Sequence, residues 1–207
     1  MRRTFWMFAL LALAGSTSRE TIKLHYLKGF VPGTRAIFRA TKVGVAPVGA
    51  DLASGSHDIG ALYDASGKVQ QQLAVTDAGT VAHDALMAAL ADAGLNPTAP
   101  SSGVDLTLSC DLEQLAVEKR FGAQQTIHGQ YFTMTSRVKL SCALRRGGAV
   151  VYANEILGAE DEPPKPVGGE VFLPLEEDPA ESLSVALSRA VGALILEPKF
   201  RSAFPPR

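Results

Sequence analysis

The sequence lacks an excess of charge of either sign. Twenty lysines and arginines stand against 21 aspartates and glutamates in 207 residues, which gives a formal net charge of -1. Nucleic acids and anionic membrane surfaces attract clustered Lys and Arg residues, so this balance argues against both kinds of partner. With 46% hydrophobic and 20% charged residues, the composition is typical of a globular chain rather than a disordered one.

Catalytic and metal-binding motifs are also missing. The chain has no Gly-x-Ser-x-Gly elbow, and Gly147-Gly148 lacks the lysine and the Ser or Thr of a phosphate loop, so this pair predicts a tight turn. The histidines lie on separate segments without the spacing of zinc ligands. They are His25, His57, His83 and His128. We therefore expect no enzyme activity, no metal site and no cofactor.

Cysteine is scarce, and its two residues do not form a Cys-x-x-Cys motif, which argues against redox catalysis. Cys110 and Cys142 each fall on the apolar face of a predicted strand, and we expect the two strands to be neighbours. In an oxidising compartment a bond between them would stabilise the fold by on the order of 3 kcal/mol. Two alternatives stay open, this disulfide or a pair of buried, reduced thiols.

Long apolar runs are absent except at the N-terminus. Arg2 and Arg3 precede an apolar run from Phe5 to Ala14, which is too short to span a bilayer and is typical of a secretion signal. The run ends in a small-x-small pattern that signal peptidase accepts. We expect residues 1–14 to be a signal peptide and residues 15–207 to form a single domain in the periplasm. The alternative is an uncleaved anchor.

Hydrophobic periodicity predicts two helices. The first follows an N-cap at Thr76 or Asp77 and ends at Gly94, which can adopt a left-handed conformation. The second begins at Asp178-Pro179 and stops before Pro198. Ser188 is expected on the face opposite the apolar stripe of this second helix. The stripe consists of Leu183, Ala186, Leu187, Ala190, Val191 and Leu194.

Alternation of apolar and polar residues predicts an antiparallel meander of three strands. The first strand starts at Val104, and its phase slips at Glu113-Gln114, which predicts a β-bulge. The second strand covers Phe132 to Arg145, and the third covers Ala149 to Leu157. A separate strand near Lys42 is expected beside the meander, joined to it through the first helix.

The remaining segments add short strands and a loop. Thr21 to Leu27 is expected as a strand, and Ile59 to Tyr63 with Lys68 to Val75 as an excursion or a small hairpin. The acidic, proline-containing stretch from Glu160 to Glu177 is expected as a surface loop. The whole order predicts an α+β fold, a two-layer sandwich with both helices on one face of a mostly antiparallel sheet.

The tip of the long hairpin combines aromatic and basic residues. These are Arg120, Phe121, His128 and Tyr131. Such a mixture is a candidate contact surface, and the alternative is an ordinary solvated turn.

The order of these features resembles that of the YajG-type lipoproteins of Gram-negative bacteria, over about Thr21 to Phe204. The resemblance implies an envelope protein that is usually lipid-anchored, and it brings no catalytic residues. Ser16 follows Leu13-Ala14-Gly15 at the place of the lipidated cysteine, and serine cannot form the thioether. The features that carry the resemblance are the leader, the leading strand, Val43-Gly44-Val45, the alanine-rich helix ending in Gly94, the Val104 to Leu108 strand, the long hairpin and the C-terminal helix.

We expect a non-enzymatic accessory or interaction protein facing the periplasm, with an envelope protein or a lipid as partner and with membrane association left open by Ser16. The alternative is an auxiliary component of a lipid-transport ABC system, whose lipoproteins the chain resembles in topology. A long apolar pocket between helices and sheet would favour lipid binding. A filled core with an exposed apolar patch would favour a protein partner.

Overall fold

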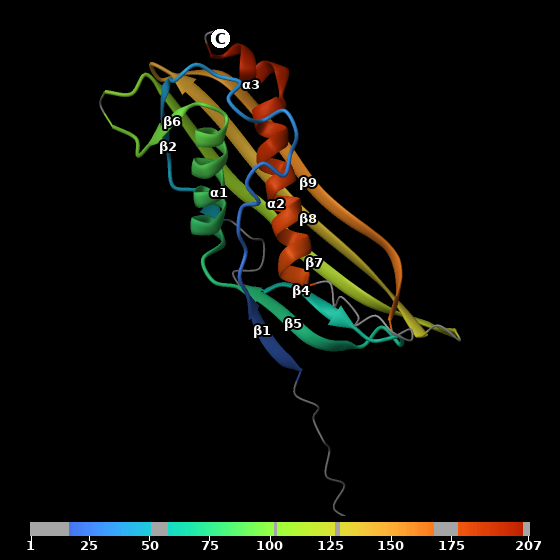
Figure 1. Cartoon of the computed structure of the whole chain (residues 1–207). Coiled ribbons are helices and arrows are strands. Elements are labelled where there is room, and N and C mark those ends of the chain that lie inside the picture. Colours follow the sequence, from blue (N-terminus) through green and yellow to red (C-terminus); the bar gives the residue numbers. More distant parts are fainter. Residues whose placement is uncertain (1–16, 51–57, 102, 127–128, 168–177, 205–207) are drawn as a thin grey trace, which may run out of the picture.

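The computed structural model describes residues 17–50, 58–101, 103–126, 129–167 and 178–204. The expected signal peptide lies outside these residues and stays a prediction. Within the described part, one layer is a mixed sheet and the other contains the two long helices (Figure 1). The fold is therefore α+β, as the order of the elements predicts.

The predicted three-strand meander contains the longest strands of the sheet. Strand β7 (Leu106–Thr126) pairs antiparallel with β8 (Gly129–Arg146), and β8 pairs antiparallel with β9 (Ala149–Val167). The predicted β-bulge is confirmed. Leu112 faces Leu140 and Gln114 faces Lys139, so Glu113 is the extra residue on β7.

Strand β9 is longer than the sequence indicates. Residues 160–167 continue the strand, and only the rest of the expected loop, residues 168–177, lies outside the described part. The prediction of a loop starting at Glu160 is therefore wrong. The pairing with β8 continues to Val167 opposite Gln130, and Arg137 on β8 forms an ion pair of 2.6 Å with Asp161 in this extension. Proline has no amide hydrogen to donate, and an edge strand tolerates it.

The other edge of β7 is covered by short parallel strands. Strands β2, β3 and β4 follow one another along β7, and β4 continues into an antiparallel hairpin with β5, which confirms the small hairpin. The expected strand from Thr21 to Leu27 is shifted, because β1 ends at Ile22 where the chain leaves β5. The short strands are β1 (Ser18–Ile22), β2 (Lys42–Val45), β3 (Gly49–Ala50), β4 (Asp58–Tyr63), β5 (Val69–Val75) and β6 (Asn96–Thr98).

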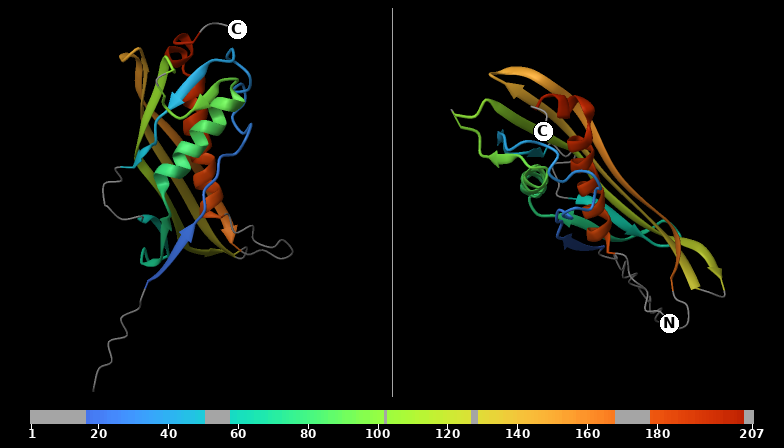
Figure 2. Two further views of the ribbon diagram at one scale, coloured as in Figure 1. Left: turned by 90° about the vertical axis from the view of Figure 1, so that its left-hand side faces the viewer. Right: turned by 45° about the horizontal axis from the view of Figure 1, so that its top comes forward.

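Both helices lie on the same face of the sheet (Figures 1 and 2). Helix α1 (Ala78–Asp92) is capped by the Asp77 carboxylate, which accepts a hydrogen bond of 3.1 Å from the Thr80 amide. Gly94 follows this helix with a φ of 99°, as the sequence predicts. Helix α2 (Pro179–Leu196) is followed by the short helix α3 (Pro198–Ser202).

The space between the helices and the sheet is filled. Leucines of the meander, such as Leu108 and Leu140, are fully buried against Leu187 and Leu194 of α2 and their neighbours. Helix α2 is also the one helix in the described residues with the length and apolarity of a membrane span, and 67% of it is buried inside the protein. Its apolar character is accounted for by the core.

The face of α2 opposite the apolar stripe, which carries Ser188, is buried rather than exposed to solvent. The Ser188 side chain is fully buried, and its hydroxyl accepts a hydrogen bond of 2.9 Å from the Leu27 amide. Ser184 likewise accepts from the His25 amide at 3.2 Å. The helix face opposite the stripe is buried because residues 24–28 lie along it, a long-range contact that the periodicity of the helix does not reveal.

Candidate functional site

The two cysteines form a disulfide inside the core. Cys110 on β7 lies directly opposite Cys142 on β8, with a Cα–Cα distance of 4.1 Å, and the two sulfurs are bonded. Of the two alternatives, the structure selects the disulfide. Both residues are buried, so the bond joins two core strands and offers no exposed sulfur for redox chemistry.

The predicted contact surface at the hairpin tip is only partly described. Arg120 and Phe121 are successive residues of β7, so their side chains point to opposite faces of the sheet. The Arg120 guanidinium stacks on the Tyr63 ring at 4.2 Å, whereas Phe121 lies near the Phe132 ring. His128 lies outside the described residues, and only the backbone of Tyr131 is placed, paired with Pro166. The four-residue surface stays a prediction.

Lys119 is a residue that the sequence reading missed. It is buried in the apolar phase of β7, and its ammonium lies 4.5 Å from the Phe132 ring centre and 5.7 Å from that of Phe121. Lys119 occupies a position of β7 where the alternation of the sequence predicts an apolar residue. Two aromatic residues at the ends of neighbouring strands are the signal that identifies its surroundings.

The open face of the meander carries paired charges. Lys139 contacts Glu113 at 2.7 Å and Glu155 at 2.9 Å, and hydrogen bonds to these carboxylates raise the pKa of its ammonium. Nearby, Arg145 donates to the Ser109 hydroxyl at 3.2 Å. Exposed pairs of this kind neutralise one another and keep the face solvated.

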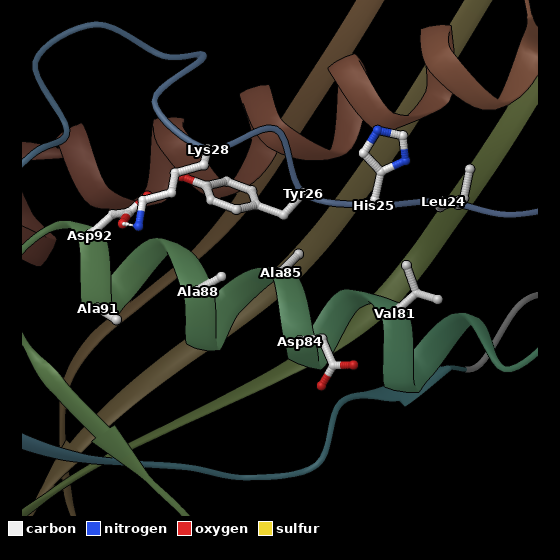
Figure 3. Close-up of a pocket in the computed structure, with 10 residues that line it drawn as sticks. All are labelled: Leu24, His25, Tyr26, Lys28, Val81, Asp84, Ala85, Ala88, Ala91 and Asp92. Carbon is white, nitrogen blue, oxygen red and sulfur yellow. Dashed lines mark ion pairs between the residues drawn. The ribbon is translucent and has the colours of Figure 1, made fainter.

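A groove lies between α1 and the extended segment Leu24–Lys28 (Figure 3). Its volume is about 500 Å³. The helix contributes a floor of small side chains, and the segment contributes the opposite wall, held in place by the serines of α2. The lining residues are Leu24, His25, Tyr26, Lys28, Val81, Asp84, Ala85, Ala88, Ala91 and Asp92.

Polar groups gather at one end of this groove. The Asp92 side chain is 10% exposed, and one of its oxygens, Oδ1, lies 2.9 Å from the Lys28 ammonium. The other oxygen, Oδ2, is buried and has no hydrogen-bond partner among the described residues. Figure 3 shows the Tyr26 hydroxyl pointing toward Lys28 and Asp92. Burial, and then the Asp92 charge, raise the pKa of Tyr26, so this hydroxyl is neutral.

The groove was not found from the sequence because its two walls are more than 50 residues apart. The sequence feature that could have indicated the groove lies in helix α1. Ala85, Ala88 and Ala91 are spaced at i, i+3 and i+6, so small residues run along α1 from the buried Ala85 to the exposed Ala88 and Ala91.

The described histidines take separate positions. His25 is exposed at the rim of the groove, and His83 places its Nδ1 3.1 Å from the carbonyl oxygen of Ala46. His57 and His128 lie outside the described residues. In the part of the chain that the structure covers, no three His, Cys, Asp or Glu side chains converge as a metal site would require.

The sheet with two helices on one face places the chain in an α+β fold that also occurs in solved bacterial proteins. No family model and no curated protein matches the sequence. Protein XCC0632 from Xanthomonas campestris, described with the family model DUF330, is similar to 90% of this chain over 97% of its own length. The TM-score is 0.53 and the sequence identity is 14%. This likeness shows the fold.

Two other solved structures are similar to the chain. One is a PelC dodecamer from Paraburkholderia phytofirmans, with 17% identity over 78% of this chain and 91% of that chain and a TM-score of 0.39. The other is a neuraminyllactose-binding hemagglutinin homolog from Helicobacter pylori, with 7% identity over 89% of this chain and 96% of that chain and a TM-score of 0.42.

Proposed function

We propose that this chain is a non-enzymatic, exported accessory protein of the bacterial envelope, of the YajG-type lipoprotein kind, that acts by binding another protein. The support is a filled core together with apolar side chains exposed on an edge strand. Val150, Val151 and Leu157 of β9 are 55%, 41% and 59% exposed. We call this strip of residues 149–159 the β9 surface.

The geometry of the β9 surface favours a partner that adds a strand. Among the described strands, β9 pairs only with β8, so its outer edge presents amides and carbonyls without a strand partner. An extended segment of a second protein would satisfy these groups, and the exposed apolar side chains would add affinity. Leu157 on this free edge is the observation that carries the proposal.

The positions of the perturbed titratable groups support a role without catalysis. Active sites concentrate such groups in one cleft. Among the described residues, Tyr26 lies in the groove, Asp64 in a tight turn, Lys139 on the open face and Tyr152 on β9, bonded to Glu197 after α2. These four groups are distributed over the protein.

The groove between α1 and residues 24–28 supports a second candidate function, the binding of a small ligand. A site of about 500 Å³ with an apolar floor falls within the size range of small-ligand sites, roughly 300 to 1,000 Å³. It would suit an auxiliary component of a lipid-transport ABC system, the alternative given by the sequence.

Site-specific photo-crosslinking in cells tests the proposal. A crosslinker at Leu157 is expected to give a heterologous protein adduct in the envelope fraction, whereas one at Lys68, exposed in the turn between β4 and β5, is expected to give none. Equal labelling at both positions, or an adduct with a second copy of this chain alone, would refute it.

Fractionation of the same cells tests export. A mature form about 193 residues long is expected outside the cytoplasm. Full-length protein confined to the cytoplasm would contradict the assignment to the envelope and remove the reason for a disulfide.

A further inference from the structure

We propose that the groove between α1 and residues 24–28 binds an aliphatic primary amine, with its alkyl chain on the alanine floor and its ammonium group on Asp92. This site is separate from the β9 surface and does not depend on it.

The groove has the shape of a binding site for an extended chain. From Val81 to Asp92 it follows roughly 16 Å of helix, at a rise of about 1.5 Å per residue. Ala88 and Ala91 are exposed on its floor, because side chains of this size leave the space beside Tyr26 open. Leu24 and Val81 close the end opposite Asp92 with apolar surface (Figure 3). A longer side chain at position 88 would occupy the volume that an alkyl chain needs.

Asp92 supplies the specificity for a cation. Burial of a carboxylate oxygen without a hydrogen bond costs free energy, and Oδ2 of Asp92 is in this state. An ammonium group has three donors and can serve both carboxylate oxygens and the neutral Tyr26 hydroxyl. Asp84 adds a second carboxylate to the lining, against the single ammonium of Lys28, so a ligand with a carboxylate or phosphate head is less favoured than a cation.

Lys28 shows that a primary ammonium fits this position. Its Nζ lies 2.9 Å from Asp92 Oδ1, while its side chain is 71% exposed. Because most of the Lys28 side chain lies in solvent, it can turn away from Asp92 without losing buried surface of its own, so a ligand with an apolar chain can displace it. Lys28 is thus a competitor for the site, and its removal should strengthen binding.

Titration of the full mature protein with n-decylammonium, followed by amide chemical shifts, tests the proposal. Decanol and decanoate of the same chain length serve as controls. We expect decylammonium to shift the amides of Ala88, Ala91 and Tyr26 and to bind roughly ten-fold more tightly than decanol, because a charge-assisted hydrogen bond contributes about 1.5 kcal/mol or more. Equal affinity for the three probes, or shifts elsewhere only, would overturn the proposal.

Three variants locate the site. Ala88→Leu should abolish binding by filling the groove, and Asp92→Asn should reduce it about ten-fold. Lys28→Ala should increase affinity several-fold. Ala65→Leu, at an exposed alanine in the turn between β4 and β5, is the matched control and should bind like the wild type.

The proposal can still be tested if one of these variants fails to fold. If Asp92→Asn fails to fold, which thermal unfolding reports, Lys28→Ala still decides, since weaker or unchanged amine binding in that variant would contradict competition at Asp92. Unchanged binding in folded Ala88→Leu would exclude the groove.

Discussion

The serines of α2 determine how the two faces of this helix are covered. Ser182 shares a hydrogen bond of 2.8 Å with Ser136 of β8, whereas Ser184 and Ser188 hold the backbone of residues 24–28. A buried hydroxyl is stable only with a partner, so each serine specifies what packs against it. The segment that forms one wall of the groove is therefore fixed by residues that look like ordinary polar positions in the sequence.

Leu187 should be critical for stability. Its side chain is fully buried between α2 and the sheet, so Leu187→Ala removes apolar contact and leaves a cavity. We expect a loss of about 2 to 5 kcal/mol in the free energy of unfolding, measured by denaturant titration. Leu157→Ala makes the same chemical change at an exposed position of β9 and should stay within about 0.5 kcal/mol of the wild type. Similar losses in both variants would contradict the assignment of the core.

Tyr152 should make the protein sensitive to alkali. Burial, and then a hydrogen bond donated by its hydroxyl to Glu197, raise the pKa of Tyr152 above its ordinary value of 10.0. The folded state therefore holds this proton more tightly than the unfolded state. The resulting stability is present below pH 10 and is lost as the pH rises further.

Thermal unfolding between pH 8 and 11 measures this effect. The Tm of the wild type should fall as the pH passes 10, and Tyr152→Phe should show a smaller fall because it has no hydroxyl to ionise at this position. Parallel pH profiles for the two proteins would contradict the role of Tyr152.

The packing of α2 on β9 depends on a single glycine. A Cβ at Gly158 would overlap the carbonyl oxygen of Ala186 and the amide nitrogen of Ala190, so only glycine allows this close approach. Gly158→Ala should cost about 1 to 3 kcal/mol through overpacking, as measured by denaturant titration. Gly103→Ala is the control, because a Cβ there meets no atom within 4 Å. If both variants unfold alike, the helix does not pack as described.

The elements that the sequence predicts well are those with a long, regular pattern. Alternation over many residues predicts the meander and the bulge near Glu113-Gln114, and a cap at Thr76 or Asp77 and another at Asp178 predict where the helices begin. Strand β3 has two residues and carries no periodic signal at all. Its position depends on pairing with β7 at Asp111 and Leu112, which is a tertiary property.

A site formed by segments that are far apart in the sequence is the hardest feature to predict from the sequence. The disulfide was among the alternatives because the strand patterns place Cys110 and Cys142 on the same face. The groove on α1 was not, because it needs residues 24–28 to leave the sheet after Ile22 and cross to α2. Local propensity describes each wall, but only the complete fold brings the walls together.

The disulfide should stabilise the protein as a whole. It joins residues 32 positions apart, so it reduces the conformational freedom of the unfolded chain across the entire β7–β8 hairpin. Replacing both cysteines with alanine should lower the free energy of unfolding by roughly 2 to 5 kcal/mol. Because both sulfurs are buried, native wild-type protein should resist reduction that the unfolded protein undergoes readily.

Thiol titration and unfolding under matched conditions measure this contribution. Denatured, non-reduced protein should show no free thiol, and the double-alanine variant should unfold at lower denaturant concentration than the oxidised wild type. Reduced wild type should then resemble the variant, since both lack the covalent link while retaining small side chains in the core. Two free thiols in the non-reduced protein, or equal stability of the oxidised and reduced forms, would mean that core packing alone holds β7 against β8.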